Sequence, residues 1–199
     1  MVASSGKQNT ESAAFRAVLR REKIAARDAM SPQEHALACS RITEELWAWL
    51  MPRKPGCIGF CWAVRKEFDC RPLVVRLLDI GWRACQPVVV KRAAPMEFRE
   101  WQPDSPMAKD MHDIPIPATT KVPAPGVLLL PLVAFDKHGF RLGYGGGYFD
   151  RTLAELDPRP ITIGVGFELG RLDSIRPTSH DIAMDIVFTE KGRRQFTAA

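Results

Sequence analysis

The clearest hydrophobic pattern in the chain is helical and lies near its start. From Ser12 to Met30, apolar residues such as Phe15, Leu19 and Ala26 fall on one helical face. Four basic residues, spaced at i, i+4, i+7 and i+11, share another face: Arg16, Arg20, Lys23 and Arg27. The pattern predicts a helix with a cationic stripe, which suits either a solvated face or a binding face.

The rest of the chain alternates between the hydrophobic pattern of helices and that of strands. Ser31, Pro32 and Glu34 mark the start of a second helix that ends near Met51. Apolar and β-branched runs predict strands at 57–62, 87–91, 96–101, 127–134, 161–167 and 184–189, and helices at 72–78 and 148–156. The proline-rich stretch between them, 102–126, is predicted to be an irregular loop. This alternation indicates the α/β class: a single three-layer α/β/α domain, 12–199, with a mostly parallel, Rossmann-like sheet, after a flexible tail, 1–11.

Composition narrows the class of protein. The 199 residues are 46% apolar and 26% charged, which is typical of a soluble globular domain. No apolar run approaches the ~20 residues of a membrane span, and the small, polar start lacks a signal-peptide core, so we expect no membrane and a cytoplasmic location. The net charge of +5 favours an anionic partner without choosing its kind. The 5 cysteines include no CxxC pair and are interpreted as small core residues.

The densest chemical signal is the segment RLGYGGGYFDR, Arg141–Arg151, which follows a predicted buried strand and opens a helix. Its glycines permit positive φ and close backbone approach, so that successive N–H groups at a helix start can converge on a phosphate. The segment matches neither the P-loop nor the GxGxxG pattern. A tight connection without a ligand is the alternative. Asp150, in the first helical turn, suits either helix-dipole compensation or Mg²⁺ ligation.

These residues resemble the 5-formyltetrahydrofolate cyclo-ligase family. The most specific match runs from Pro131 to Arg151. Three further pieces agree with the family in order: Arg16 with Arg20, Glu67 with Asp69, and His180-Asp181 followed by Asp185 and Thr189-Glu190. The resemblance implies an ATP- and Mg²⁺-dependent closure of 5-formyltetrahydrofolate to 5,10-methenyltetrahydrofolate, with ADP and phosphate released. It requires no protein nucleophile, so Arg16, Arg141 and Tyr148 would act by position and charge.

The resemblance also assigns roles to individual residues. It implies that the ATP-binding residues are Arg16, Arg20, Arg141, Gly143, Tyr144, Gly145, Gly146, Gly147, Tyr148 and Phe149. Those for the folate would be Trp62, Glu67, Met96, Gly147 and Tyr148, and the Mg²⁺ ligands would be Asp150 and Asp181. Lys23 and Arg27 are expected to be solvated. Arg16 stands where the family commonly has Lys, and Phe149 where it commonly has Tyr, which bears on nucleotide affinity.

Two other functions compete with the cyclo-ligase. A non-catalytic folate-binding paralogue would have no need of the two metal carboxylates. A nucleic-acid-binding protein on the same fold would suit the pI of 9.1 and the basic first helix, but no aromatic and basic strand signature supports it. We therefore expect ATP and 5-formyltetrahydrofolate as partners, nucleic acid to be absent, and a monomer. The folate is expected at the carboxyl ends of the strands.

Overall fold

A large twisted sheet forms the centre of the protein in its computed structural model, which describes residues 3–111 and 113–196. Its strands are β1 (Cys57–Gly59), β2 (Arg83–Val88), β3 (Glu97–Trp101), β6 (Lys121–Val122), β7 (Val127–Pro131), β10 (Ile161–Val165), β12 (Ile186–Thr189) and β13 (Gly192–Gln195). They lie in the order β13-β12-β10-β7-β1-β2-β3-β6. The five inner strands from β12 to β2 are parallel. At the edges, β13 pairs antiparallel with β12, β3 with β2, and β6 with β3.

The chain leaves the centre of this sheet in two directions. From β1 it moves to β2, and from the neighbouring β7 it moves the opposite way to β10 and β12. The segments that follow β1 and β7 therefore diverge, and we call the region at the carboxyl ends of these two strands the crevice, since α/β sheets open at such a point. The crevice is where an α/β protein of this kind binds its ligand, and Glu67 and the glycine-rich loop belong to the two segments that border it.

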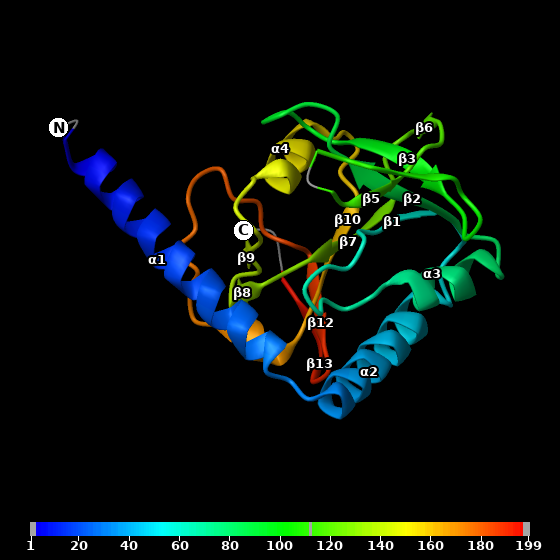
Figure 1. Ribbon diagram of the computed structural model, residues 1–199, viewed down its shortest axis with the longest axis horizontal. Coiled ribbons are helices and arrows are strands. Elements are labelled where there is room, and N and C mark those ends of the chain that lie inside the picture. Colours follow the sequence, from blue (N-terminus) through cyan, green and yellow to red (C-terminus); the bar gives the residue numbers. More distant parts are fainter. Residues whose placement is uncertain (1–2, 112, 197–199) are drawn as a thin grey trace.

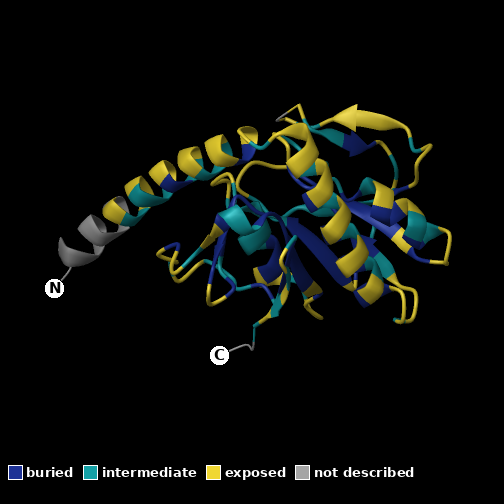
Figure 2. Ribbon diagram, turned by 90° about the horizontal axis from the view of Figure 1, so that it is seen from below, coloured by how far each residue is buried: buried dark blue, intermediate teal, exposed yellow. Residues whose placement is uncertain are grey.

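Helices pack on both faces of the sheet. On one face, α2 (Pro32–Leu50) and α3 (Arg71–Leu78) bury side chains such as Ile42, Leu46 and Leu73 against the sheet. On the other face, α4 (Tyr148–Glu155) buries Leu153 beside Leu128. Figure 1 shows the sheet between these helices, and Figure 2 shows that the sheet is the most deeply buried layer.

The first helix, α1 (Ala3–Asp28), packs along one side of the body with its C-terminal part, and its N-terminal end extends away from the body (Figures 1 and 2). Its Leu19 contacts a small three-stranded sheet at the same end of the molecule as the crevice. That sheet consists of β8 (Ala134–Asp136), β9 (Arg141–Leu142) and β11 (Arg171–Leu172), the last preceded by the 3₁₀ turn η1 (Glu168–Gly170). A hairpin of β4 (Met107–Lys109) and β5 (Pro115–Pro117) completes the described structure.

The predicted fold class is confirmed, and several predicted boundaries are wrong. The first helix begins at Ala3 instead of Ser12, so the described part of the predicted tail is helical, while the domain division itself stays a prediction. The second strand runs Arg83–Val88, earlier than predicted, because it pairs from Arg83 onward with Cys57 of β1. The stretch 102–126 contains β4, β5 and β6. None of the described helices is long and apolar enough to cross a bilayer.

Candidate active site

The glycine-rich loop joins β9 to α4 at the carboxyl end of the central sheet. Gly145 has a φ of +96 and Gly147, the N-cap of α4, has a φ of +64, a backbone conformation that side chains with a Cβ resist. A Cβ on Gly145 would lie 3.3 Å from the Arg20 guanidinium, and one on Gly146 would lie 2.8 Å from the Tyr148 ring. The glycines are therefore required both by the turn and by the side chains packed against it.

The cationic face of α1 lies against this loop. Arg20 donates from Nε to the Gly143 carbonyl at 2.7 Å. Arg16 forms a bidentate pair with Asp181, with both N–O distances 2.8 Å. Burial, and then the charge of Arg16, lowers the pKa of Arg20. Two guanidinium groups thus lie close together beside exposed backbone, an arrangement suited to a polyanion such as a triphosphate.

The two predicted metal carboxylates are neighbours, although they are far apart in sequence. Asp150 on α4 accepts at Oδ1 from the Ile182 N–H, 3.1 Å away, and Ile182 directly follows Asp181. Arg141, which exposes only 6% of its surface, pairs with Asp150 at 3.2 Å and also interacts electrostatically with Asp181. The site therefore places two carboxylates around one buried guanidinium.

The carboxylate of Asp181 is held in its ionised form. Burial alone raises its pKa, but the hydrogen bonds from Arg16 and from the N–H and hydroxyl of Thr178 outweigh burial, so that the pKa is lowered overall. An ionised, fixed carboxylate is the form that ligates a divalent cation.

These residues fit a magnesium ion that is shared with a nucleotide. Mg²⁺ commonly takes one or two protein carboxylates and completes its octahedron with phosphate oxygens and water. Across residues 3–111 and 113–196, no three His, Cys, Asp or Glu side chains converge as a metal cage. Asp150 and Asp181 together supply the number of protein ligands that such an ion takes. Each also has an arginine partner, which a metal would have to share or displace.

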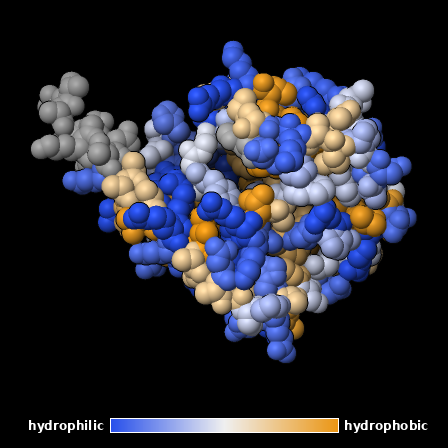
Figure 3. Space-filling model, in the orientation of Figure 1, coloured by the Kyte–Doolittle hydropathy of each residue, from blue (hydrophilic) through white to orange (hydrophobic). Residues whose placement is uncertain are grey.

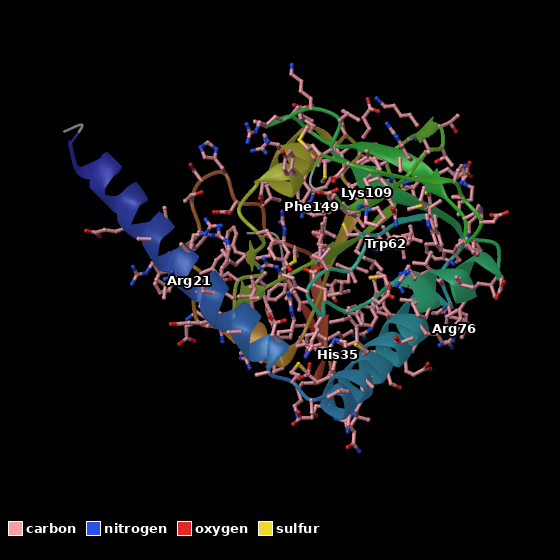
Figure 4. The ribbon with its side chains drawn as sticks, viewed as in Figure 1. Arg21, His35, Trp62, Arg76, Lys109 and Phe149 are labelled. Atoms are coloured by element: carbon pink, nitrogen blue, oxygen red, sulfur yellow. The ribbon has the colours of Figure 1, made fainter. Side chains whose placement is uncertain are left out.

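The two aromatic residues after the loop begin α4. Tyr148 is half-buried, and the guanidinium carbon of Arg151 lies over its ring, 5.1 Å from the ring centroid. Phe149, labelled on α4 in Figure 4, lies 5.5 Å from the Arg141 guanidinium carbon. Arg151 also donates to the Gly146 carbonyl, which ties the helix back to the loop.

Two of the predicted folate residues, Glu67 and Met96, contact the glycine-rich loop or the helix that follows it. Glu67, in the segment after β1, exposes only 6% of its surface. Its Oε2 accepts from the Val64 N–H at 3.1 Å, whereas its buried Oε1 has no hydrogen-bond partner among the described residues. Burial raises the pKa of Glu67, and the Val64 N–H, the charge of Arg27 and the Tyr144 hydroxyl partly offset that effect. A buried acceptor without a donor at this position is available to a donor from a ligand or from water.

Trp62 and Met96 come from two different segments. Trp62, which follows β1, is half-buried, with the Arg71 guanidinium 4.4 Å from its ring (Figure 4). The Met96 N–H donates to Thr152 Oγ1 at 2.9 Å, and that hydroxyl donates to the Tyr148 carbonyl at 2.7 Å. Met96 is therefore tied to the helix that carries Tyr148 and Asp150.

The expectation that Lys23 and Arg27 are solvated is wrong. Lys23 donates to the Leu169 carbonyl at 2.6 Å, and Arg27 exposes only 3% of its surface. The whole cationic stripe of α1 thus faces the body. The i, i+4, i+7, i+11 spacing places these two residues on the same face as Arg16 and Arg20, and that shared face is the available signal. Figure 3 shows hydrophilic and hydrophobic residues mixed over the face in view.

Comparison of the sequence with protein families gives one clear match. The model of the 5-formyltetrahydrofolate cyclo-ligase family matches residues 12–190. A 5-formyltetrahydrofolate cyclo-ligase of Mycolicibacterium smegmatis is 34% identical over 128 residues, covering 60% of this chain and 66% of that protein. One of Escherichia coli K12 is 37% identical over 130 residues, covering 62% of this chain and 71% of that protein.

Solved structures show the same fold. The NMR structure of Aquifex aeolicus 5,10-methenyltetrahydrofolate synthetase aligns with a TM-score of 0.80 at 22% identity, covering 93% of this chain and 94% of that one. The 5,10-methenyltetrahydrofolate synthetase of Mycoplasma pneumoniae aligns with a TM-score of 0.73 at 23% identity, covering 88% of this chain and 98% of that one. At these identities the likeness speaks for the fold alone.

Proposed function

The chain belongs to the 5-formyltetrahydrofolate cyclo-ligase family, and from this premise we propose that it closes 5-formyltetrahydrofolate to 5,10-methenyltetrahydrofolate at the expense of ATP. The observation that carries the proposal is the convergence of the α1 arginines, the glycine-rich loop and two carboxylates beside a buried, half-satisfied glutamate. The first three suit a nucleotide and its metal, and the glutamate suits a flat ring rich in N–H donors.

The proposed reaction needs no covalent bond to the protein. The formyl oxygen attacks the γ-phosphorus and ADP leaves. N10 of the folate then attacks the activated formyl carbon, loses its proton, and the carbon–oxygen bond breaks to release phosphate. The products are 5,10-methenyltetrahydrofolate, ADP and phosphate. Such a transfer depends on positioning and charge neutralisation, which buried arginines and fixed loop N–H groups provide.

On the nucleotide side, the roles divide among three elements. Arg16 and Arg20 of α1 would bind phosphate oxygens, since their guanidinium groups lie beside the loop. The loop 143–147 would wrap the phosphates with its backbone, and Tyr148 and Phe149 would flank the transfer position. Arg141, buried between the carboxylates, would hold both of them in place. Each role is supported by these contacts and by the family's residue pattern.

Asp150 and Asp181 would hold Mg²⁺, which when bound neutralises charge on the transferring phosphate. In the proposed complex, Arg16 and Arg141, the arginine partners of these carboxylates, would donate some of their hydrogen bonds to the nucleotide instead. The existing Arg16–Asp181 pair therefore keeps both side chains oriented before the ligand arrives.

On the folate side, Glu67 would accept hydrogen bonds from the pterin through its unpartnered Oε1. Trp62 and Met96 would line the ring, and Gly147 and Tyr148 would border the formyl group. Glu67 interacts with the Tyr144 hydroxyl of the glycine-rich loop, which supports a pterin bound beside that loop.

The proposal is tested by the near-ultraviolet band of the methenyl product, a conjugated amidinium, when protein is mixed with 5-formyltetrahydrofolate, Mg²⁺ and ATP. We expect product only when ATP is present. Asp150→Asn should lower kcat by roughly 10²- to 10³-fold, the scale for removing one electrostatic contact to a transferring group. Asp173→Asn, an exposed aspartate, is the matched control and should leave kcat unchanged. Folate binding without product would instead support a non-catalytic folate-binding protein.

The cellular setting remains a set of predictions. We expect a monomer in the cytoplasm that does not bind nucleic acid. Light scattering of the purified protein tests the first, and the salt dependence of any nucleic-acid binding tests the last.

A further inference from the structure

Arg27 is a buried charge with an unusual set of partners. Its Nε donates to the Arg65 carbonyl at 2.9 Å and its Nη1 to the Leu132 carbonyl at 3.4 Å. Its Nη2 donates to the Tyr144 hydroxyl at 2.8 Å. All three partners are neutral. A buried guanidinium normally pairs with a carboxylate, because an uncompensated charge in the interior is costly.

The carboxylate that compensates Arg27 is that of Glu67, at a distance beyond a direct hydrogen bond. The two side chains interact electrostatically, and the Tyr144 hydroxyl interacts with both. Because Tyr144 accepts from Arg27, its own O–H proton remains to be directed elsewhere, and Glu67 is the acceptor that it faces. The buried Glu67 Oε1 receives no direct hydrogen bond among the described residues, so the Tyr144 hydroxyl lies near the carboxylate without satisfying it.

The three elements that meet at Arg27 are the elements that form the site. Arg27 comes from α1, Tyr144 from the glycine-rich loop, and Arg65 from the segment that carries Glu67. Tyr144 exposes 44% of its surface although its hydroxyl is anchored by Arg27, so part of the residue stays open to a ligand. One fork thus joins the nucleotide side of the crevice to the folate side.

We propose that Arg27 is a positioning residue that couples the two substrate sites: it anchors the glycine-rich loop through the Tyr144 hydroxyl and places its positive charge beside Glu67. The inference rests on the proposed function and adds a residue to it. Arg27 has two separable roles in this proposal. The first is a tether to Tyr144, which needs the guanidinium fork, and the second is a positive charge beside Glu67, which any cation supplies.

The tether is tested by a double-mutant cycle on kcat with Arg27→Lys and Tyr144→Phe. Lys keeps the charge but cannot reach three acceptors at once, and Phe removes only the hydroxyl. We expect each single change to lower kcat by about 10-fold and the double change to lower it no further, since both break one interaction. Losses that multiply in the double variant would overturn the tether. Tyr144 is exposed, so the Phe variant is expected to fold.

The charge is tested by the pH dependence of the KM for 5-formyltetrahydrofolate. The groups that face Glu67 are Arg27, Tyr144, Cys61 and Cys70, and only Arg27 among them is cationic. Without the Arg27 charge the pKa of Glu67 rises further. As the pH is lowered, the KM should therefore begin to increase at a higher pH in Arg27→Met than in the wild type. Arg27→Lys should keep the wild-type profile. Equal profiles for the Met and wild-type proteins would overturn this part.

A control variant and an independent readout separate this inference from the proposed function. Arg21→Met removes an exposed cation from the same helix (Figure 4) and should leave kcat, KM and the pH profile unchanged. If the wild-type protein formed no product, the proposed function would fail. Calorimetric affinity for 5-formyltetrahydrofolate in the same variants would then decide the inference: a loss confined to Arg27→Met at low pH supports it, and equal affinities overturn it.

Discussion

At the scale of single residues, the site is a set of charges held by neighbours of opposite sign. Asp181 takes two hydrogen bonds from Arg16, and Asp150 takes one from the Ile182 N–H while paired with Arg141. Glu67 differs, because burial raises its pKa and one of its oxygens stays unpartnered. The difference separates carboxylates already organised for a cation from one that awaits hydrogen-bond donors.

The Arg16–Asp181 pair predicts an acid-dependent part of the stability. Because the folded state lowers the pKa of Asp181, the stabilisation is fully present above the ordinary aspartate value of ~3.9 and is lost as the pH falls through the lower folded value. Asp181→Asn should therefore lower the free energy of unfolding by roughly 2 kcal/mol at neutral pH. Urea titrations should show that difference shrinking in acid, whereas Asp173→Asn should differ little at any pH. A difference independent of pH would contradict the ion pair.

Residue chemistry was only partly readable from the sequence. The helical spacing grouped Arg16, Arg20, Lys23 and Arg27 on one face, but spacing cannot tell whether that face meets water or protein. Only the tertiary structure, which puts carbonyl groups of distant segments opposite Lys23 and Arg27, shows that both point inward. The pairing of Asp150 with Asp181 came from family resemblance, since no local spacing relates them.

At the scale of elements, the backbone of the glycine-rich loop is constrained by its own sequence. Its conformation depends on left-handed φ values and on space taken by Arg20, Tyr148 and Arg151. The loop and the following helix were predicted nearly to the residue because glycine clusters and helix starts are local signals. By contrast, β13 (Gly192–Gln195) carries no apolar alternation, so its pairing with β12 was not predictable.

A single methyl group in this loop should disturb both stability and nucleotide binding. Gly147→Ala puts a Cβ at a φ of +64 and 2.9 Å from Arg151 Nη1, so we expect a loss of about 1–2 kcal/mol and a higher KM for ATP. Thermal unfolding and steady-state kinetics measure both. Gly126→Ala is the matched control, since nothing lies within 4 Å of its added Cβ and its φ is not left-handed. Equal behaviour of the two variants would contradict the strained turn.

At the scale of the whole molecule, the site exists because the chain adds strands to the sheet in opposite directions from β1 and from β7. The divergence brings the Glu67 segment and the glycine-rich loop together at the carboxyl ends of these strands, and α1 packs along one side of the body (Figure 1). The side chains of Arg20 and Arg27 point from α1 toward the loop. The α/β class followed from the alternation of helical and strand periods. The strand order did not, because it depends on long-range pairings such as Ile163 with Leu129.

The central claim is that this crevice brings the formyl oxygen of the folate to the γ-phosphate of ATP. The most direct measurement is turnover of 5-formyltetrahydrofolate labelled with ¹⁸O in the formyl group, with mass analysis of the released phosphate. We predict that each phosphate formed carries the label, because the formyl oxygen leaves the folate bound to phosphorus. Unlabelled phosphate accompanying stoichiometric 5,10-methenyltetrahydrofolate would contradict phosphorylation of the formyl oxygen and the arrangement of the site derived from it.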